Sequence, residues 1–354
     1  MKIIFVTATL TSGGSERVIS LLANKMAEKG HLVEIICLRN QIVFYPINSD
    51  VKVIFAAKEA LWDCLPLKVI WLRKYIKLAT PDVVIPFMTA VYCTTIFALI
   101  GLDITVIASE RIDPSHSNTL RKILRKVFLP MATHLVVQTE NIKKYYNRKI
   151  QKRTTVIYNP VSNKVFEVLN LPKINRIVSV GRLYPQKNQK MMIDAFYKIK
   201  DKYPDYKLVI YGEGPLREEL EEYIKKLSLL GRILLPGRNE EVINELKRSV
   251  LFCLSSDYEG MSNALIEAQC VGLPIITTRV SGAEELFVNN KNGIIIDTGD
   301  VDGLAEAMNI LLEDPEKMNS FSLENTKRAS LFKIDRIVDQ WLELINLISC
   351  RQER

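Results

Sequence analysis

The sequence lacks the residue patterns on which metalloproteins, disulfide-stabilised proteins and many hydrolases depend. Its six cysteines are scattered without a C-x-x-C pair, and its three histidines lie far apart. This usage argues against a zinc site or a disulfide framework and fits a reducing cytosol. No G-x-S-x-G, Walker or G-x-G-x-x-G motif is present, and no nucleophile stands beside a base. A serine hydrolase, a P-loop nucleotide hydrolase and a dinucleotide-binding dehydrogenase are therefore not indicated.

Long hydrophobic runs are also scarce. The apolar run at residues 1–7 is too short for a signal peptide and is interpreted as a first strand. Residues 83–102 carry no charge over a length that could span a bilayer. Pro86 and several threonines interrupt this stretch, so we expect a buried strand at 83–86 and a buried helix at 90–100. A transmembrane helix is the alternative.

Length and charge indicate two domains of different character. A chain of 354 residues favours two domains, because single cores stop growing near roughly 250–300 residues. Its 48% hydrophobic and 25% charged content is that of an ordinary soluble protein. Residues 1–170 contain 23 Lys and Arg against 12 Asp and Glu, whereas the remainder is mildly acidic. The first half is therefore expected to face an anionic partner, either nucleic acid or a membrane surface with its lipid phosphates.

Strands and helices alternate in the pattern of a doubly wound fold, and the pattern occurs twice. Strands are predicted at 3–6, 31–37, 83–86, 105–108, 135–138 and 155–157, and again at 176–180, 207–211, 233–235, 250–254, 275–277 and 293–296. The predicted fold class is α/β, with two Rossmann-like domains whose loops meet in a cleft beyond the strand carboxyl ends. The expected domains are 1–168 and 172–330, with 331–354 as a C-terminal helix packing back towards the first.

The most informative stretch is residues 257–268. It predicts the end of a buried strand, a short loop and a helix that begins near Gly260. A helix start presents backbone N–H groups and a positive dipole end, which favour a phosphate. Glu259 precedes that start, and Glu267 lies a little over two turns along the helix. This arrangement suits a nucleotide-sugar diphosphate, and the alternative is an ordinary β–α unit with two solvated glutamates.

Two other loops follow predicted strands. Arg182 and Lys187 are two cations in one loop, suited to a diphosphate leaving group, although they could also be solvated surface charges. Gly13 and Gly14 let backbone amides approach a ligand closely, unless they serve loop geometry alone. Asp300 and Asp302 match the D-x-D pattern of metal-dependent sugar transferases but are expected to cap the helix that follows.

Aromatic and basic residues are mixed on a helix predicted within residues 62–79. Its aromatic residues Trp62, Trp71 and Tyr75 are interleaved with four cations. Such a helix suits an interfacial membrane contact, and the alternative is a packed amphipathic helix with solvated lysines. The cations are Lys68, Arg73, Lys74 and Lys77. A second basic cluster occupies residues 121–126.

Taken together, the motifs resemble those of one enzyme family. The motifs, in order, are Gly13-Gly14-Ser15-Glu16-Arg17, Gly181-Arg182 with Lys187-Asn188, Gly212-Glu213-Gly214, and Glu259 with Glu267. The sequence resembles, over nearly its whole length, the retaining family 4 glycosyltransferases of GT-B architecture. It is most similar to bacterial members that extend polyprenyl-diphosphate-linked glycans in glycoprotein, capsule or lipopolysaccharide assembly.

The resemblance implies a role for each residue of the donor site. Arg182 and Lys187 would hold the donor diphosphate, Glu259 would bind the sugar hydroxyls and Glu267 the ribose. Further donor contacts are expected from Gly13, Gly14, Gly212, Glu213, Gly260, Met261, Ser262 and Asn263. The donor is a nucleotide sugar, expected to be UDP-linked and to carry a hexose or N-acetylhexosamine. The family is usually metal-independent, so neither a metal nor another cofactor is expected.

The resemblance is less definite on the acceptor side. Many members carry a histidine where this chain has Arg111, so either Arg111 or His116 could serve the acceptor. In some relatives a basic helix of the N-terminal domain binds the lipid diphosphate. The acceptor-side candidates are Glu16, Arg111, His116, Lys68, Arg73, Lys74 and Lys77. We therefore expect a cytoplasmic protein held peripherally on the inner face of the cell membrane, acting on a lipid-linked glycan and not on nucleic acid. A GT-B epimerase, a phosphorylase and a nucleic-acid-binding protein are the alternatives.

Overall fold

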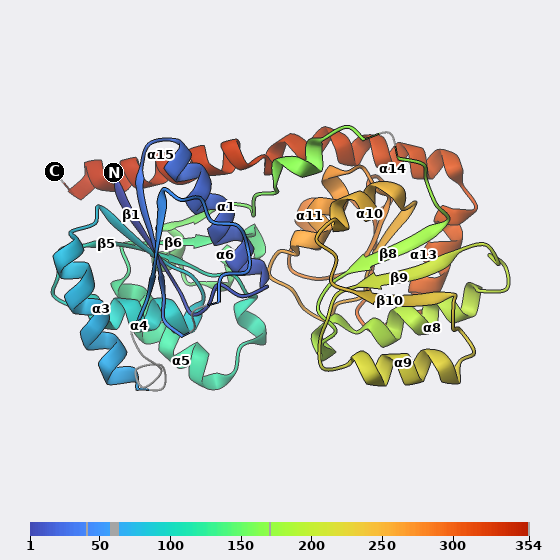
Figure 1. Ribbon diagram of the computed structural model, residues 1–354, viewed down its shortest axis with the longest axis horizontal. Helices are drawn as coiled ribbons and strands as arrows, with labels where there is room; N and C mark the ends of the chain where they lie inside the picture. The colour runs from blue at the N-terminus through green and yellow to red at the C-terminus, as the bar shows by residue number, and fades with distance from the viewer. Residues whose placement is uncertain (40–41, 57–63, 170, 353–354) are drawn as a thin grey trace. The chain divides into compact units, whose positions relative to one another are not determined.

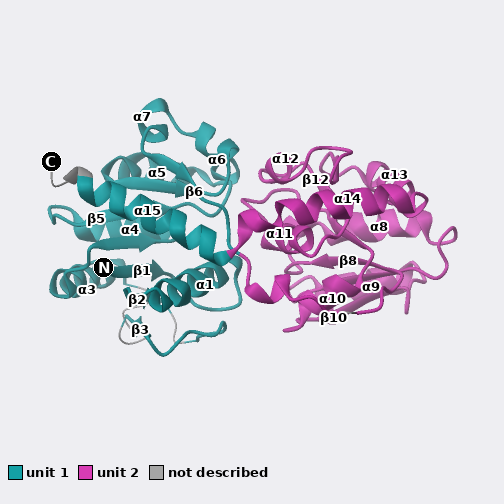
Figure 2. Cartoon of the chain, turned by 90° about the horizontal axis from the view of Figure 1, so that it is seen from above, with its two compact units in different colours: residues 1–160, 334–354 teal, residues 161–333 magenta. Residues whose placement is uncertain are grey.

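A computed structural model of the protein describes residues 1–39, 42–56, 64–169 and 171–352. The chain forms two compact units, shown in different colours in Figure 2. The first unit combines residues 1–160 with 334–354, and the second comprises residues 161–333. The boundary thus falls about ten residues before the linker that the sequence predicts, part of which lies outside the described residues. The C-terminal helix belongs to the first unit.

The first unit contains a seven-stranded, wholly parallel sheet of order β3-β2-β1-β4-β5-β6-β7. Its strands are β1 (Lys2–Thr7), β2 (Leu32–Cys37), β3 (Val51–Phe55), β4 (Val83–Pro86), β5 (Thr105–Ser109), β6 (His134–Val137) and β7 (Thr154–Val156). The order changes direction between β1 and β4, which confirms the predicted doubly wound fold. β3 was not predicted.

Helices cover both faces of this sheet (Figure 1). They are α1 (Gly14–Glu28), α3 (Leu65–Ala79), α4 (Thr89–Leu99), α5 (Thr119–Phe128), α6 (Glu140–Tyr145), α7 (Arg148–Gln151) and α15 (Ile334–Gln352). Successive side chains of a strand point to opposite faces. Ile3 and Phe5 of β1 therefore pack with α1 and α15, whereas Ile4 and Val6 pack with α3 and α4.

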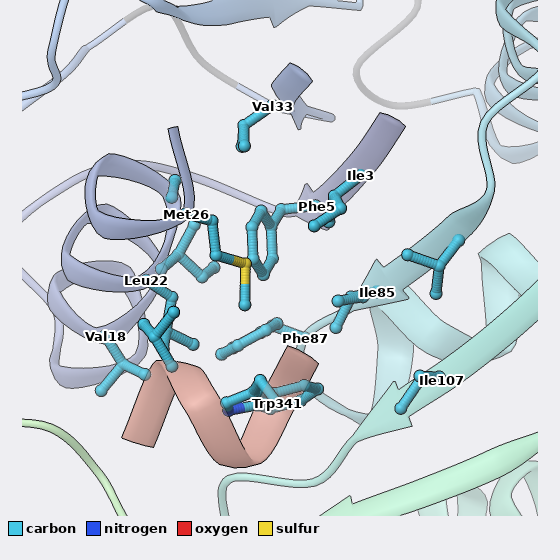
Figure 3. Packing of buried hydrophobic residues seen from close by; sticks show 14 of the residues in the cluster. Ile3, Phe5, Val18, Leu22, Met26, Val33, Ile85, Phe87, Ile107 and Trp341 are labelled. Atoms are coloured by element: carbon cyan, nitrogen blue, oxygen red, sulfur yellow. The ribbon is translucent and has the colours of Figure 1, made fainter. Parts of the chain in front are cut away.

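The core on the α1 and α15 side centres on aromatic rings. Phe87, which follows β4, lies between Phe5 and Trp341, with ring centroids 6.0 and 6.5 Å away (Figure 3). Trp341 is a fully buried residue of α15, so the last helix completes a core that begins with the first strand. Burying a large aromatic side chain stabilises a core by roughly 3 kcal/mol.

The second unit is also doubly wound, with a six-stranded parallel sheet of order β10-β9-β8-β11-β12-β13. Its strands are β8 (Arg176–Val180), β9 (Lys207–Tyr211), β10 (Ile233–Gly237), β11 (Leu251–Leu254), β12 (Ile275–Thr278) and β13 (Ile294–Ile296). Its helices are α8 (Gln189–Ile199), α9 (Arg217–Lys226), α10 (Val242–Arg248), α11 (Asn263–Cys270), α12 (Ala283–Leu286), α13 (Val301–Leu312) and α14 (Pro315–Arg328). α14 was not predicted from the sequence.

The uncharged stretch at residues 83–102 forms β4 and the buried helix α4, as predicted. Among the residues that the structure describes, no helix combines the length and the apolar character needed to cross a membrane.

A buried ion pair connects α5 to the carboxyl end of β5 in the first sheet. The Glu110 carboxylate, fully buried after β5, accepts hydrogen bonds from Arg125 Nε (2.9 Å), Tyr92 (2.9 Å) and Thr89 (3.1 Å). Arg125 is 4% exposed and also donates to Ser117 Oγ at 3.1 Å. A buried charge that loses its partner is strongly destabilising, so this pair fixes the orientation of α5.

Arg125→Met should therefore lower the free energy of unfolding by about 3–5 kcal/mol, because it leaves the Glu110 carboxylate buried without its cation. Urea unfolding followed by circular dichroism measures the loss. Lys126→Met, at the exposed neighbouring position, is the matched control and should change stability by less than about 0.5 kcal/mol. Equal stability of the two variants would contradict a structural role for the ion pair.

Candidate functional site

The predicted donor residues gather where the second sheet changes direction. β8 and β11 are adjacent parallel strands, although β9 and β10 separate them in sequence. Ligands of doubly wound domains bind beyond the strand carboxyl ends at such a switch point. The loop after β8 carries Arg182 and Lys187, and the loop after β11 carries Glu259. The sheet therefore places on one edge side chains that are more than seventy positions apart in sequence.

Hydrogen bonds join these two loops along their length. The Asp257 N–H donates to the Gln186 carbonyl at 2.9 Å, and the Gln186 side chain donates to the Tyr258 carbonyl at 2.7 Å. Asn188 Nδ2 donates to the Asp257 carboxylate at 2.9 Å. Ser255 Oγ donates to the carbonyls of Lys187 and Asn188, at 3.0 and 2.9 Å. The loops thus form one preorganised surface.

Lys187 and Glu259 form an ion pair at the centre of this surface. The Lys187 and Glu259 side chains are 15% and 10% exposed, and Ser256 Oγ donates to the same Glu259 oxygen at 2.8 Å. A cation and an acceptor for hydroxyl groups are therefore held side by side. The Lys187 ammonium can bind an anionic ligand group, and the Glu259 carboxylate can accept hydrogen bonds from hydroxyl groups of a ligand.

Arg182 lies on the same loop in a more open setting. Its side chain is exposed, and its guanidinium stands 4.8 Å from the ring centroid of Tyr184. A guanidinium over an aromatic face can still donate from the N–H groups at its edge to a ligand. The structure thus brings the two predicted cations into one loop, one paired with a carboxylate and one on an aromatic ring.

α11 starts at Asn263, three residues later than predicted from the sequence. The correction has a local reason, because Gly260, Met261 and Ser262 continue the loop and Ser262 becomes the N-cap residue. The Ser262 side chain makes no capping hydrogen bond, which leaves the positive end of the helix without a side-chain acceptor from its own N-cap. Glu267 is in the second turn and only 2% exposed.

A buried amide network, which the sequence analysis did not single out, holds α11 in place. The Gln269 side chain donates to the carbonyl of Leu286 at 3.0 Å and to Asn325 Oδ1 at 3.3 Å. Asn292 Nδ2 donates to the same Asn325 oxygen at 3.0 Å, and Asn325 Nδ2 donates to the Leu273 carbonyl at 2.8 Å. Buried amides that find partners at such separations give no periodic signal in the sequence.

Gly212 and Gly214 have a packing role that the structure shows directly. A Cβ atom on Gly212, where φ is +145°, would fall 1.9 Å from the Gly181 carbonyl oxygen, and one on Gly214 would fall 2.2 Å from that of Leu183. The turn after β9 therefore supports the cation-bearing loop through backbone contact. The intervening Glu213 pairs with Arg217 at 2.7 Å. Nothing in this geometry requires Glu213 to contact a donor.

In the first unit, Gly13 and Gly14 belong to the start of α1 rather than to a loop. Gly13 is the N-cap residue, and a Cβ there would lie 2.1 Å from a Glu16 carboxylate oxygen. Glu16 accepts hydrogen bonds from Thr9 Oγ1 at 2.8 Å and from Ser15 Oγ at 2.7 Å. The glycine at position 13 thus makes room for a carboxylate of the same chain.

Arg111 and His116, the two acceptor-side alternatives, occupy different environments. Arg111 follows β5, is 8% exposed and donates to Asn159 Oδ1 at 2.8 Å. Its guanidinium stands 4.5 Å from the ring centroid of Phe87. Burial lowers the pKa of Arg111 to about 9, so the group stays cationic at neutral pH. His116 lies exposed in a short 3₁₀ helix at residues 114–116.

The basic face predicted on α3 is only partly available. Arg73 does not point outward, because its Nη1 donates to the carbonyls of Ala98 (2.8 Å) and Ile100 (2.7 Å) at the end of α4. Tyr75 donates to the Glu34 carboxylate at 2.8 Å and stacks on Trp71. Trp62 lies outside the described residues. Lys74 and Lys77 are exposed, and Lys68 is half-buried.

α5 presents an apolar stripe that the sequence analysis did not predict. Leu120, Ile123 and Val127 are 63%, 54% and 55% exposed, whereas Arg125 is buried. These positions are spaced three and four apart, so they lie along one helix face. Arg121, Lys122 and Lys126 are exposed beside them. The sequence predicted the basic cluster at 121–126. It did not predict that Arg125 would turn inward to pair with Glu110 and leave the apolar residues of α5 exposed.

Asp300 and Asp302 have structural partners. Asp300 is the N-cap residue of α13 and accepts from the Gly303 N–H at 2.8 Å, which confirms the predicted capping role. Asp302 pairs with Lys198.

Solved structures with the same arrangement define the fold class. Sucrose-phosphate synthase from Thermosynechococcus elongatus matches with a TM-score of 0.85 over 99% of both chains, at 18% identity. Anabaena HepE in complex with UDP matches with a TM-score of 0.80 over 98% of this chain and 100% of its own, also at 18% identity. These likenesses establish the GT-B fold.

Sequence comparisons define the family. The family description "Glycosyltransferase Family 4" matches residues 12–164, and "Glycosyl transferases group 1" matches residues 162–328. The chain is 32% identical, over 98% of both sequences, to the Campylobacter jejuni GalNAc-alpha-(1->4)-GalNAc-alpha-(1->3)-diNAcBac-PP-undecaprenol alpha-1,4-N-acetyl-D-galactosaminyltransferase. It is 34% identical to the Escherichia coli UDP-Gal:alpha-D-GlcNAc-diphosphoundecaprenol alpha-1,3-galactosyltransferase over 47% of this chain and 45% of that one. The protein belongs to the family 4, group 1 glycosyltransferases.

Proposed function

We propose that the protein is a retaining glycosyltransferase that moves a hexose or N-acetylhexosamine from a UDP-sugar to a polyprenyl-diphosphate-linked glycan. The observation that carries the donor half of this proposal is the Lys187–Glu259 pair at the switch point of the second sheet, directly before the start of α11. The names of the Campylobacter and Escherichia relatives, which both specify an undecaprenol diphosphate acceptor, support the other half.

The donor diphosphate fits the cationic part of this surface. Its oxygens accept hydrogen bonds from Arg182 and Lys187 and lie at the positive end of α11. When Lys187 turns to a phosphate, the Glu259 carboxylate loses that partner and accepts hydrogen bonds from sugar hydroxyls instead. Ser256 keeps the carboxylate oriented during this exchange. By the family resemblance, we assign the ribose to Glu267, one turn into the helix.

Transfer then needs no protein nucleophile. The bond between the sugar C1 and the phosphate oxygen breaks, and a bond from C1 to the acceptor oxygen forms on the same face. The acceptor hydroxyl proton passes to the departing phosphate oxygen, whose charge Arg182 and Lys187 stabilise. The chain's own contribution is charge stabilisation and positioning, without a metal ion.

A lipid-linked acceptor places the enzyme at the cytoplasmic face of a membrane. The stripe of Leu120, Ile123 and Val127 suits insertion into the headgroup region, and the flanking cations suit anionic lipids. α3 and α5 both pack against α4, and the exposed Lys74 and Lys77 of α3 add two cations on this side of the sheet. Arg73 does not contribute, because it caps α4.

Removal of the donor-site charges tests the first part of the proposal. Arg182→Ala and Lys187→Ala should each weaken UDP binding roughly 10- to 100-fold, because a charge-assisted hydrogen bond contributes roughly 1.5–3 kcal/mol. Glu259→Ala should abolish transfer while the protein stays folded. Calorimetry with UDP and a transfer assay with a panel of UDP-sugars measure both. Lys190→Ala, an exposed lysine of α8, is the control. Wild-type affinity in the first two variants would remove the diphosphate role.

Chelation tests the metal-independent step. If Arg182, Lys187 and the α11 start stabilise the leaving diphosphate, transfer should continue at an unchanged rate in excess EDTA. The measurement is UDP release during transfer, with and without added manganese. Activity that disappears with EDTA and returns with manganese would contradict this mechanism.

Vesicle binding tests the membrane face. Leu120→Ser/Ile123→Ser/Val127→Ser should release the protein from phosphatidylglycerol vesicles but leave UDP binding unchanged, because the donor residues belong to the other unit. Lys122→Glu/Lys126→Glu should also weaken sedimentation with these vesicles, since each cation contributes about 1 kcal/mol near an anionic surface.

Two comparisons sharpen the vesicle experiment. Leu323→Ser replaces a residue that is 64% exposed on α14 and should have no effect. Lys74→Glu/Lys77→Glu measures the separate contribution of α3. If this last variant alone releases the protein, α3 is the membrane face and the assignment to α5 is wrong.

A further inference from the structure

The residues around Arg111 leave an unusual number of buried polar atoms without partners. Within the described part of the chain, Arg111 Nε and Nη2, Ser109 Oγ, Gln138 Oε1 and Trp341 Nε1 are buried and meet no hydrogen-bond partner. Ser109 ends β5, Gln138 follows β6, and Trp341 lies on α15. Buried polar groups normally have partners, so such a concentration points to a group that is bound there.

The two buried arginines at this edge differ in one respect. Arg125 meets the Glu110 carboxylate at 2.9 Å, whereas Arg111 donates to a neutral amide oxygen of Asn159. A buried cation without a counter-ion destabilises a fold. The Glu110 carboxylate also attracts Arg111, so one buried negative charge faces two buried cations and forms an ion pair with only one of them.

The orientation of Arg111 is fixed even though the Glu110 carboxylate forms its ion pair with Arg125. Its guanidinium lies 4.5 and 5.9 Å from the ring centroids of Phe87 and Trp341. Asn159 Oδ1 accepts from Arg111 Nη1 and is itself held by Gln138 Nε2 at 2.7 Å. The edge formed by Nε and Nη2 is left unpaired, and this edge pairs with two oxygens of one phosphate or carboxylate.

We propose that Arg111 binds an oxyanion of the acceptor substrate through this Nε–Nη2 edge, at the carboxyl ends of the first sheet. The proposal rests on the proposed function, which assigns the acceptor to the first unit. The oxyanion comes from either the diphosphate of the lipid or a carboxylate on the acceptor glycan. Bidentate pairing with an oxyanion explains why this position holds a guanidinium whose Nε–Nη2 edge has no partner in its own domain. It also assigns the acceptor role to Arg111 rather than to His116.

The test uses inorganic pyrophosphate and acetate as probes for the two sources of the oxyanion. Each is titrated by calorimetry into the full chain with UDP at saturation, so that the donor site is occupied. The variants are Arg111→Met, Arg111→Lys and, as a donor-site control, Arg182→Met. Thermal unfolding of each variant without ligand distinguishes a binding role from a structural one.

We expect one probe to bind the wild type, to bind Arg111→Met at least about tenfold more weakly, and to bind Arg182→Met as it does the wild type. Arg111→Lys keeps the positive charge but cannot form two parallel hydrogen bonds to one oxyanion, so its affinity for the probe should be intermediate. The melting temperature of Arg111→Met should be equal to or above that of the wild type, because a buried, desolvated charge is replaced by an apolar chain of similar size.

Each other outcome is decisive. Binding of pyrophosphate identifies the lipid diphosphate, and binding of acetate alone identifies a glycan carboxylate. If neither probe binds the wild type, or if both bind Arg111→Met unchanged, the proposal is wrong. A lower melting temperature of Arg111→Met with unchanged probe binding makes Arg111 structural. If UDP does not bind, the donor assignment has failed. Pyrophosphate titration of Arg182→Met without nucleotide then still reports on Arg111, so the two failures are distinguished.

Discussion

The candidate donor site depends on the change of direction in the second sheet. Because β8 and β11 are neighbours only in space, the loops that follow them can be joined by side-chain and backbone hydrogen bonds over their whole length. Those bonds hold Lys187 against Glu259 before a ligand is present. A site built in this way loses little entropy when a ligand binds, since the reorganisation is limited to the exchange of one ion pair.

In the first unit, two buried arginines follow a different arrangement from the Lys187–Glu259 pair of the second unit. One arginine forms an ion pair with a carboxylate of the same domain and thereby orients a helix, and the other is oriented by aromatic rings and shares the attraction of that carboxylate. The first arrangement explains why α5 turns its apolar residues outward. A helix of this composition would normally bury Leu120, Ile123 and Val127 and expose Arg125. The ion pair therefore determines which face of α5 is exposed.

The sequence was sufficient for the features that depend on local patterns. The alternation of strands and helices predicted both doubly wound units, and the glycine and cation positions after strands predicted which loops carry Arg182, Lys187 and Glu259. Features that depend on distant partners were missed. Arg73 caps carbonyls 25 and 27 positions away, and Arg125 turns inward to meet a carboxylate fifteen positions away. The later start of α11 was missed because the residues after Gly260 are compatible with either loop or helix.

The return of α15 to the first unit has a consequence for the order in which the chain folds. Residues 161–333, a complete unit, are synthesised before the helix that brings Trp341 to Phe87. During that interval the apolar surface around Phe5 and Phe87 has no cover from the helix that later buries it. Contacts over such a sequence separation form slowly, and exposed apolar surface promotes aggregation. The first unit therefore completes its core only after the residues beyond position 333 have been synthesised.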